Sequence, residues 1–185
     1  GAVYFDCSGW LLNSTLHGNQ AAVGGAIAVG SFADVSMRSS IVYGNRAQAG
    51  QVFVRQGDGR GGKINISYCA IPDAETAVLA SGDWAVIHWG EGNLDAEPAL
   101  YFAPDISDLA FDANDLPLDT GDLPFDANDL DYHLRFHSPC IDAGHLQYDA
   151  APDEVDMDGQ ARILNGRIDM GADEVGGCLA RVAVP

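Results

Sequence analysis

Apolar and polar positions alternate in three short, glycine-led segments in the first third of the chain. They are GAVYF at Gly1, GAIAV at Gly25 and GQVFV at Gly50, so they recur after 24 and then 25 residues. In each segment the apolar residues occupy every second position, as Val3 and Phe5 do in the first. A period of two is the pattern of a β-strand with one buried face. The sequence therefore predicts one short strand per repeat, with Val3, Ile27 and Val52 in one column.

Each copy continues into a second apolar stretch, namely WLLNSTLHGN, DVSMRSSIVYGN and KINISYCAI. The first two end in Gly-Asn, at Gly18-Asn19 and Gly44-Asn45. Glycine and asparagine tolerate left-handed backbone conformations, so we expect a recurring tight corner with Asn19 lying over Asn45. Leucine-rich repeats are excluded because their leucine and asparagine consensus is absent, and helical repeats because no helical apolar period occurs. The pattern predicts an all-β fold, a parallel β-helix in which each repeat forms one coil of a solenoid.

The segments GGAIAV and IVYGN resemble the GGAI and GN repeats of polymorphic outer-membrane-protein type β-helices. These are bacterial surface and autotransported proteins, and the resemblance covers about two coils. It implies a secreted bacterial protein that contains a right-handed parallel β-helix.

A different set of motifs begins at Gly92, with the phrases GNLDAEPALYF, DYHLRFHSPCIDAG and DMDGQARILNGRIDMGADE in that order. Over about 80 residues they resemble the C-terminal module of many secreted bacterial β-helix proteins, the choice-of-anchor Q domain. The resemblance implies a loop-rich C-terminal capping module, whose molecular activity these motifs do not define. We therefore divide the chain into β-helix coils over residues 1–90, the cap module over 91–176 and a tail over 177–185.

An acidic insertion at about 105–130 separates the first two phrases. Its aspartates fall alternately four and three apart, at Asp108, Asp112, Asp115, Asp119, Asp122, Asp126 and Asp129, and its leucines recur every seven. A coiled coil is disfavoured because Pro117 and Pro124 would each cost a helix about 3 kcal/mol. We predict turns joined by short extended segments. Calcium ligation and a solvated loop with Asx turns are the two alternatives for the carboxylates.

The segment from Glu154 to Asn165 is similar to the first half of an EF-hand loop. Glu154, Asp156 and Asp158 place oxygen ligands at alternate positions before a glycine, which predicts a calcium site. The twelfth position is Asn165, so no bidentate carboxylate closes the loop. The alternative is a structural turn in which Arg162 or Arg167 pairs with Asp169 or Asp173.

The acidic excess behind the net charge of −18 lies after residue 70, because the first 70 residues hold only three acids against five bases. A chain this acidic repels phosphate backbones and anionic headgroups, which argues against nucleic acid and membrane-surface partners. No apolar run approaches the roughly 20 residues that span a bilayer. Four cysteines lack zinc-ligand spacing, so we expect disulfides or buried thiols.

The coils offer few groups for catalysis. Lyases and glycosidases built on β-helices need paired carboxylates or a calcium cluster with a basic residue, whereas Asp6, Asp34 and Asp58 occupy unrelated places in their coils. His17 precedes a Gly-Asn corner where Tyr43 stands in the next coil, so we expect it to pack.

We therefore expect a secreted or cell-surface structural or adhesion scaffold that is not catalytic in this chain and needs no cofactor other than calcium. The alternative is the C-terminal part of a β-helix polysaccharide lyase or glycoside hydrolase whose active site lies upstream. A first coil that begins with a strand presents an uncovered cross-section, so we expect upstream coils or a head-to-tail copy to cover it, and carbohydrate is a further candidate partner.

Overall fold

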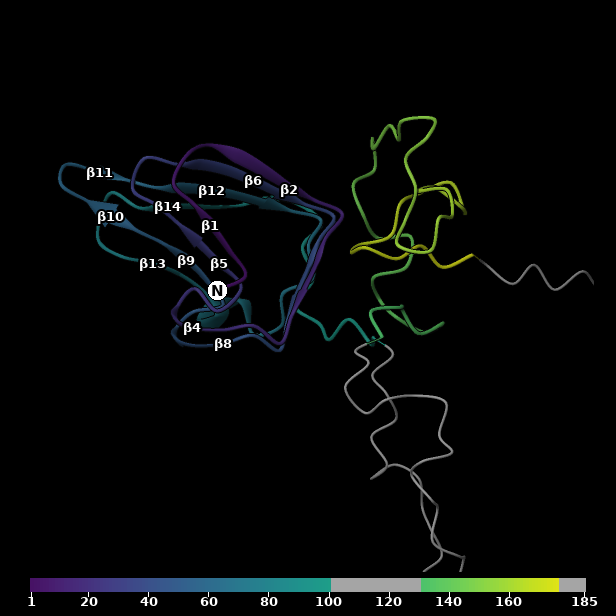
Figure 1. Ribbon diagram of the computed structural model, residues 1–185, viewed down its shortest axis with the longest axis horizontal. Helices are drawn as coiled ribbons and strands as arrows, with labels where there is room; N and C mark the ends of the chain where they lie inside the picture. Colours follow the sequence, from purple (N-terminus) through teal and green to yellow (C-terminus); the bar gives the residue numbers. More distant parts are fainter. Residues whose placement is uncertain (101–130, 177–185) are drawn as a thin grey trace, which may run out of the picture.

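Strands stacked in parallel form a β-solenoid of about three turns in the computed structural model, which describes residues 1–100 and 131–176 (Figure 1). The acidic insertion lies outside these residues, as does the tail over 177–185. The all-β fold predicted from the repeats is confirmed, with one helical turn, α1 (Ala74–Ala77), between coils.

The first sheet contains the glycine-led strands in parallel register. It runs β1 (Val3–Phe5), β5 (Ile27–Val29), β9 (Val52–Val54) and β13 (Val78–Ala80). Val3 pairs with Ile27 and Ile27 with Val52, so the predicted column is confirmed. Val78 extends it by one further strand that the repeat analysis had not included.

A second parallel sheet faces the first across the core. Its order is β2 (Gly9–Leu12), β6 (Asp34–Arg38), β12 (Lys63–Ser67) and β14 (Val86–Trp89). Two narrower faces complete the coils, one from β3 (Thr15–His17) and β7 (Ile41–Tyr43), the other from β4 (Gln20–Val23) and β8 (Arg46–Ala49). The glycine-rich insertion of the third repeat forms a small antiparallel hairpin, β10 (Gln56–Gly57) and β11 (Arg60–Gly61).

Inward-facing aliphatic side chains fill the space between the sheets. Ile27, Val35 and Ile64 have no exposed surface, whereas Val3 in the first coil is only half-buried. Each coil covers the apolar side chains of the next, so the inner coils are the best buried.

The Gly-Asn corners form as predicted. Gly18 and Gly44 have φ values of 69° and 63°, in the left-handed region. Asn45 Oδ1 accepts hydrogen bonds from the backbone N–H of Asn19 at 3.0 Å and from Asn19 Nδ2 at 3.0 Å. Asn45 Nδ2 in turn donates to Leu16 O at 2.8 Å, so one side chain joins two coils.

A second recurring corner, after each strand of the second sheet, was not predicted. Asn13, Ser39, Tyr68 and Gly92 occupy it, and all four have positive φ. The residue that follows is bonded across coils: Ser14 N donates to Ser40 Oγ at 3.2 Å, and Cys69 N donates to Asn93 Oδ1 at 3.0 Å. The residue types differ from coil to coil, which is why the sequence showed no repeat here.

Residues 131–176 pack against the side of the coils (Figure 1). The contacts follow the face that contains β3 and β7: Ala172 N donates to Thr15 Oγ1 at 3.1 Å, Gly171 N donates to Ser39 O at 2.8 Å, and the Arg167 guanidinium lies 5.7 Å from the centre of the Tyr68 ring. We expected this module to cap an end of the solenoid. Its described contacts instead touch three successive coils.

The lateral position has a packing reason. Ile41 and Ala70 are fully buried in a second apolar cluster with Leu134, Cys140 and Met170 of the module. Gly171 permits the close approach, since a Cβ there would lie 2.8 Å from Ile41 Cδ1 and 2.8 Å from Thr15 Oγ1.

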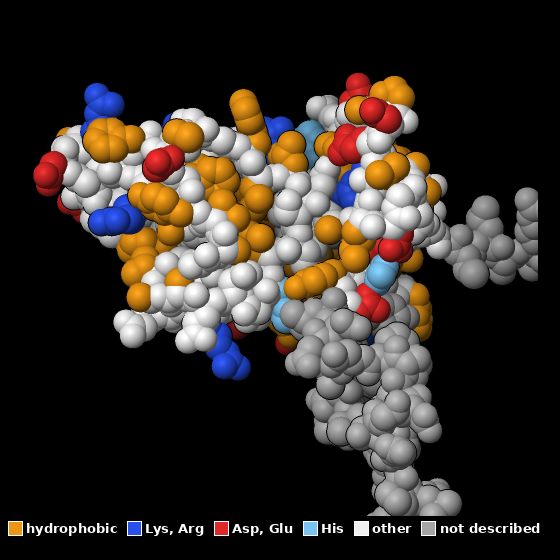
Figure 2. All heavy atoms as spheres, viewed as in Figure 1, with side chains coloured by type: hydrophobic (Ala, Val, Ile, Leu, Met, Phe, Trp, Pro, Cys, Tyr) orange, Lys and Arg blue, Asp and Glu red, His pale blue; other side chains and the backbone are white. Residues whose placement is uncertain are grey.

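Charge and hydrophobic surface are distributed unevenly (Figure 2). Acidic side chains gather on the C-terminal module, and hydrophobic side chains lie exposed over the near face of the coils. Tyr4 and Trp10 of the first coil are 59% and 77% exposed. Among the described cysteines, Cys69 and Cys140 are buried free thiols and Cys7 is exposed and free. Within the described ranges, no helix has the length and hydrophobicity of a membrane span.

Candidate functional site

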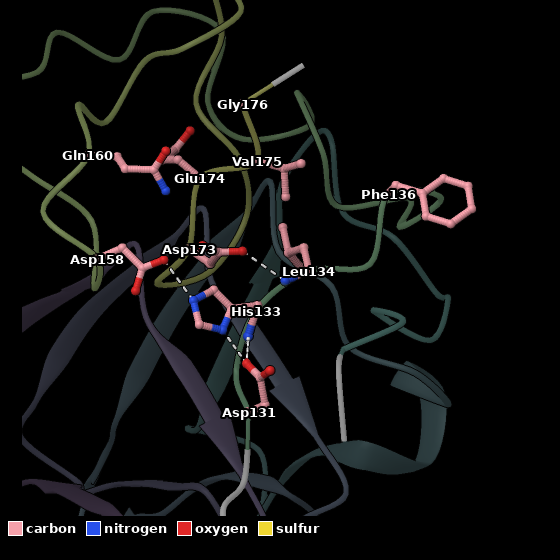
Figure 3. Close-up of a pocket in the computed structure, with 10 residues that line it drawn as sticks. All are labelled: Asp131, His133, Leu134, Phe136, Asp158, Gln160, Asp173, Glu174, Val175 and Gly176. Atoms are coloured by element: carbon pink, nitrogen blue, oxygen red, sulfur yellow. Dashed lines mark hydrogen bonds and ion pairs between the residues drawn. The ribbon is translucent and has the colours of Figure 1, made fainter. Parts of the chain in front are cut away.

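A cavity of about 530 Å³ opens on the C-terminal module (Figure 3). It is lined by Asp131, His133, Leu134, Phe136, Asp158, Gln160, Asp173, Glu174, Val175 and Gly176. These residues come from three separate segments, so the cavity exists only in the folded module.

His133 lies in the cavity between two carboxylates. Its Nε2 atom is 2.7 Å from Asp158 Oδ2, and its Nδ1 atom contacts Asp131 Oδ1 (Figure 3). Burial alone would lower the pKa of the imidazole, but the hydrogen bonds to Asp131 and Asp158 raise it to about 9. In this arrangement the ring is an imidazolium at neutral pH, held at both nitrogens.

Asp173 forms the inner wall of the cavity and is 3% exposed. Its Oδ2 atom accepts a hydrogen bond from the backbone N–H of Leu134 at 2.8 Å. Burial raises the pKa of this carboxyl group, while that hydrogen bond and the charge of His133 oppose the rise. One ligand atom each from His133, Asp158 and Asp173 lies within 4.8 Å of the others.

Behind the cavity, buried carboxylates bind backbone amides. Asp169 Oδ1 accepts from Asp142 N at 2.5 Å and its Oδ2 from Val175 N at 2.7 Å. Asp169 N in turn donates to both carboxylate oxygens of Glu174, at 3.2 and 3.1 Å. These bonds hold together a segment that forms no named strand between residues 131 and 176.

A buried ion pair closes this network. Arg162 and Glu174 are each 2% exposed, and Arg162 Nη2 lies 3.2 Å from Glu174 Oε1. The same guanidinium donates to the carbonyl oxygens of Gly171 and Ala172. The structural turn that we considered for this segment thus has a buried arginine, but its carboxylate partner is Glu174 and not Asp169 or Asp173.

Burial of these acids changes their titration. It raises the pKa of Asp169 to about 6, against the hydrogen bonds from Val175 and Asp142. It raises the pKa of Glu174 to about 8, and the neighbouring Asp169 charge adds to the effect while Arg162 opposes it. Both groups therefore hold a proton more firmly in the folded chain than in water.

The three predicted calcium ligands face different partners. Glu154 Oε1 contacts the Tyr148 hydroxyl and lies 3.4 Å from Asn13 Nδ2. Asp156 Oδ1 accepts from Asp158 N at 2.9 Å, as in an Asx turn. Only Asp158 directs its carboxylate into the cavity. Asn165, the twelfth position, donates from Nδ2 to Val175 O. The calcium site remains a prediction.

The groups that we considered on the coils have ordinary packing contacts. Asp34 lies 3.2 Å from Lys63 Nζ and accepts from Asn65 Nδ2 at 3.1 Å. His17 stands over Tyr43, with ring centres 5.5 Å apart, as the repeat analysis predicted. Burial lowers the pKa of His17.

Sequence reasoning missed His133 and Asp173 as site residues. His133 is 25 residues from Asp158, so no local spacing joins them. The signal in the sequence was that both belong to the polar phrases DYHL and GADE, which have no counterpart in the coils.

No family model, curated protein or solved structure matches this chain.

Proposed function

We propose that this chain is a structural or adhesion segment of a secreted bacterial protein, displayed at the cell surface, and that it is a scaffold without a catalytic role of its own. One observation carries the proposal: four acidic side chains between residues 156 and 174 are buried and accept hydrogen bonds from backbone amides, namely Asp156, Asp169, Asp173 and Glu174. Carboxylates with buried hydrogen bonds to the main chain stabilise a fold and are withdrawn from substrate.

The resemblances noted in the sequence support the same proposal. In it, the coils are right-handed and of the polymorphic outer-membrane-protein type, and residues 91–176 are a choice-of-anchor Q type module. The lateral contacts with three successive coils suit such a module, because they fix it to the side of the solenoid.

The proposal includes a further coil that covers the open side of the first coil. Val3 and Phe5 of the first coil are half-buried, whereas their column neighbours Ile27 and Val29 have no exposed surface. A further coil stacked on β1, from the same polypeptide or from a head-to-tail copy, would bury them equally.

The experiment compares polysaccharide binding with polysaccharide cleavage. The chain is incubated with neutral and uronic-acid polysaccharides, with and without added calcium. New reducing ends, unsaturated products and retention on the insoluble polymers are measured. A scaffold leaves the polymers intact whether or not it is retained. Release of oligosaccharides would contradict the proposal and support the lyase or glycoside hydrolase alternative.

A further inference from the structure

We propose that His133, Asp158 and Asp173 bind one divalent transition-metal ion of the zinc class in the cavity of the C-terminal module. This site is separate from the predicted calcium loop, with which it shares only Asp158. The proposal does not depend on the scaffold function.

The geometry of His133 matches a metal-bound imidazole. Nε2 points to Asp158 Oδ2 at 2.7 Å, while the opposite nitrogen, Nδ1, is bonded to Asp131 (Figure 3). Metal-ligating histidines commonly donate their other N–H to a carboxylate, which fixes the tautomer and the ring orientation. Asp131 would have this positioning role, and the ion would take the place of the proton between Nε2 and Asp158 Oδ2.

Asp173 is the second indication of a bound cation. It is 3% exposed, and its Oδ2 atom is occupied by Leu134 N–H. The side chain lines the cavity, and one of its carboxylate oxygens lies within 4.8 Å of ligand atoms of His133 and Asp158. A carboxylate this deeply buried is costly to keep charged, and a cation beside His133 and Asp158 would compensate that cost.

The ligand set selects the kind of ion. One imidazole nitrogen and two carboxylates are three ligands, the number that zinc sites with an open fourth position have. Calcium takes six to eight oxygen ligands, and magnesium prefers carboxylates and water, so both fit this set less well. The cavity leaves room for water at the open position.

Such an ion would join three segments that are far apart in the sequence. His133 follows the acidic insertion, Asp158 lies in the turn organised by Asp156, and Asp173 adjoins the residues bonded to β3 and β7. Occupancy would thus stabilise the folded module by mass action.

The test is calorimetric titration of the metal-free chain with zinc chloride and, separately, with calcium chloride. Cys7→Ser and Cys178→Ser are introduced first, so that thiols do not supply zinc ligands. We expect one zinc ion per chain and a higher melting temperature with zinc. His133→Gln and Asp173→Asn should each weaken zinc binding at least a hundredfold, and Asp131→Asn about tenfold to a hundredfold.

His137→Gln is the matched control, because His137 is an exposed histidine four residues from His133, and it should leave zinc affinity unchanged. If His133→Gln does not fold, cobalt(II) bound to the parent chain provides a second measurement, since paramagnetic shifts should appear on the His133 ring protons. Three results would overturn the proposal: no stoichiometric zinc binding, zinc binding that His133→Gln leaves intact, or tighter calcium binding that is lost in Glu154→Gln.

Discussion

At the scale of single residues, acidic side chains of the C-terminal module accept hydrogen bonds from backbone N–H groups, which strand pairing satisfies in the coils. Asp156, Asp169 and Glu174 are at most 7% exposed, and each accepts hydrogen bonds from backbone N–H groups. Charge-assisted bonds of this kind are stronger than neutral ones, and they compensate part of the cost of burying the charge. The remaining cost of burying the charge raises the pKa of Asp169 and Glu174.

The free energy of unfolding should fall as the pH rises from about 4 to 8. The pKa of Asp169 rises from 3.8 to about 6 on folding, and that of Glu174 from 4.5 to about 8. Because the folded chain binds these protons more tightly, losing them between the unfolded and folded pKa values favours the unfolded chain.

Urea unfolding at pH 5 and pH 8, with EDTA present, measures this pH dependence. Glu174→Gln should flatten it, and Asp153→Asn, at an exposed position, should not. Stability that increases from pH 5 to pH 8 in the unmodified chain would show that the acids are stabilised by ionisation.

The sequence identified some of these residues but not their partners. The spacing of Asp156 and Asp158 predicted a turn, which forms. Arg162 was expected to pair with Asp169 or Asp173 and lies against Glu174, because the choice among three nearby acids depends on backbone direction at Gly171 and Ala172. His133 reaches Asp158 only through tertiary folding.

At the scale of the elements, an asparagine ladder joins successive coils. Asn45 is 8% exposed and bonds to Asn19, Leu16 and Tyr43, whereas Asn19 is half-buried at the edge of the ladder. Buried groups that lose a partner cost more than exposed ones, so the two asparagines should contribute unequally.

Asn45→Ala should lower the free energy of unfolding by about 2–3 kcal/mol and Asn19→Ala by about 1 kcal/mol. The reason is that Asn45→Ala removes both the acceptor for Asn19 and the donor to Leu16 O. Denaturant unfolding of both variants checks the order. Equal losses, or a larger loss for Asn19→Ala, would mean that the ladder does not connect the coils as described.

The repeat pattern predicted the strands of the first sheet and the Gly-Asn corners because the same residue types recur there. The corner at Asn13, Ser39 and Tyr68 escaped prediction, since its shared property is a positive φ in residues of unlike chemistry. The fourth strand, β13, escaped because its leading segment lacks the glycine signature.

At the scale of the whole molecule, the module lies along the coils while β1 remains an edge strand. Val3 N donates to Ala26 O at 3.0 Å and Phe5 O accepts from Gly30 N at 2.7 Å, so the backbone groups of Tyr4 point to the open edge. Sequence alone could not place the module. Ile41 faces outward and belongs to the apolar run IVY, which predicts that both faces of the strand are buried but does not identify the segment that covers Ile41.

We expect the chain to self-associate through this edge, with a sedimentation coefficient that rises with concentration. Tyr4→Pro removes the outward donor without disturbing the bonds to β5, so it should reduce the association, while Tyr4→Val should preserve it. A parent chain that sediments as a monomer at all concentrations would remove head-to-tail stacking from the proposal.

Amide hydrogen exchange measures most directly whether the motif carboxylates build structure on the coils. The amides of Leu134, Asp142 and Val175 donate to Asp173 or Asp169, and they should be protected to a degree similar to Val42 in the solenoid, which donates to Ala70 O. Exchange of the module amides at the rate of an unfolded peptide, with the coils still protected, would contradict a structural role for these acids and with it the proposed scaffold.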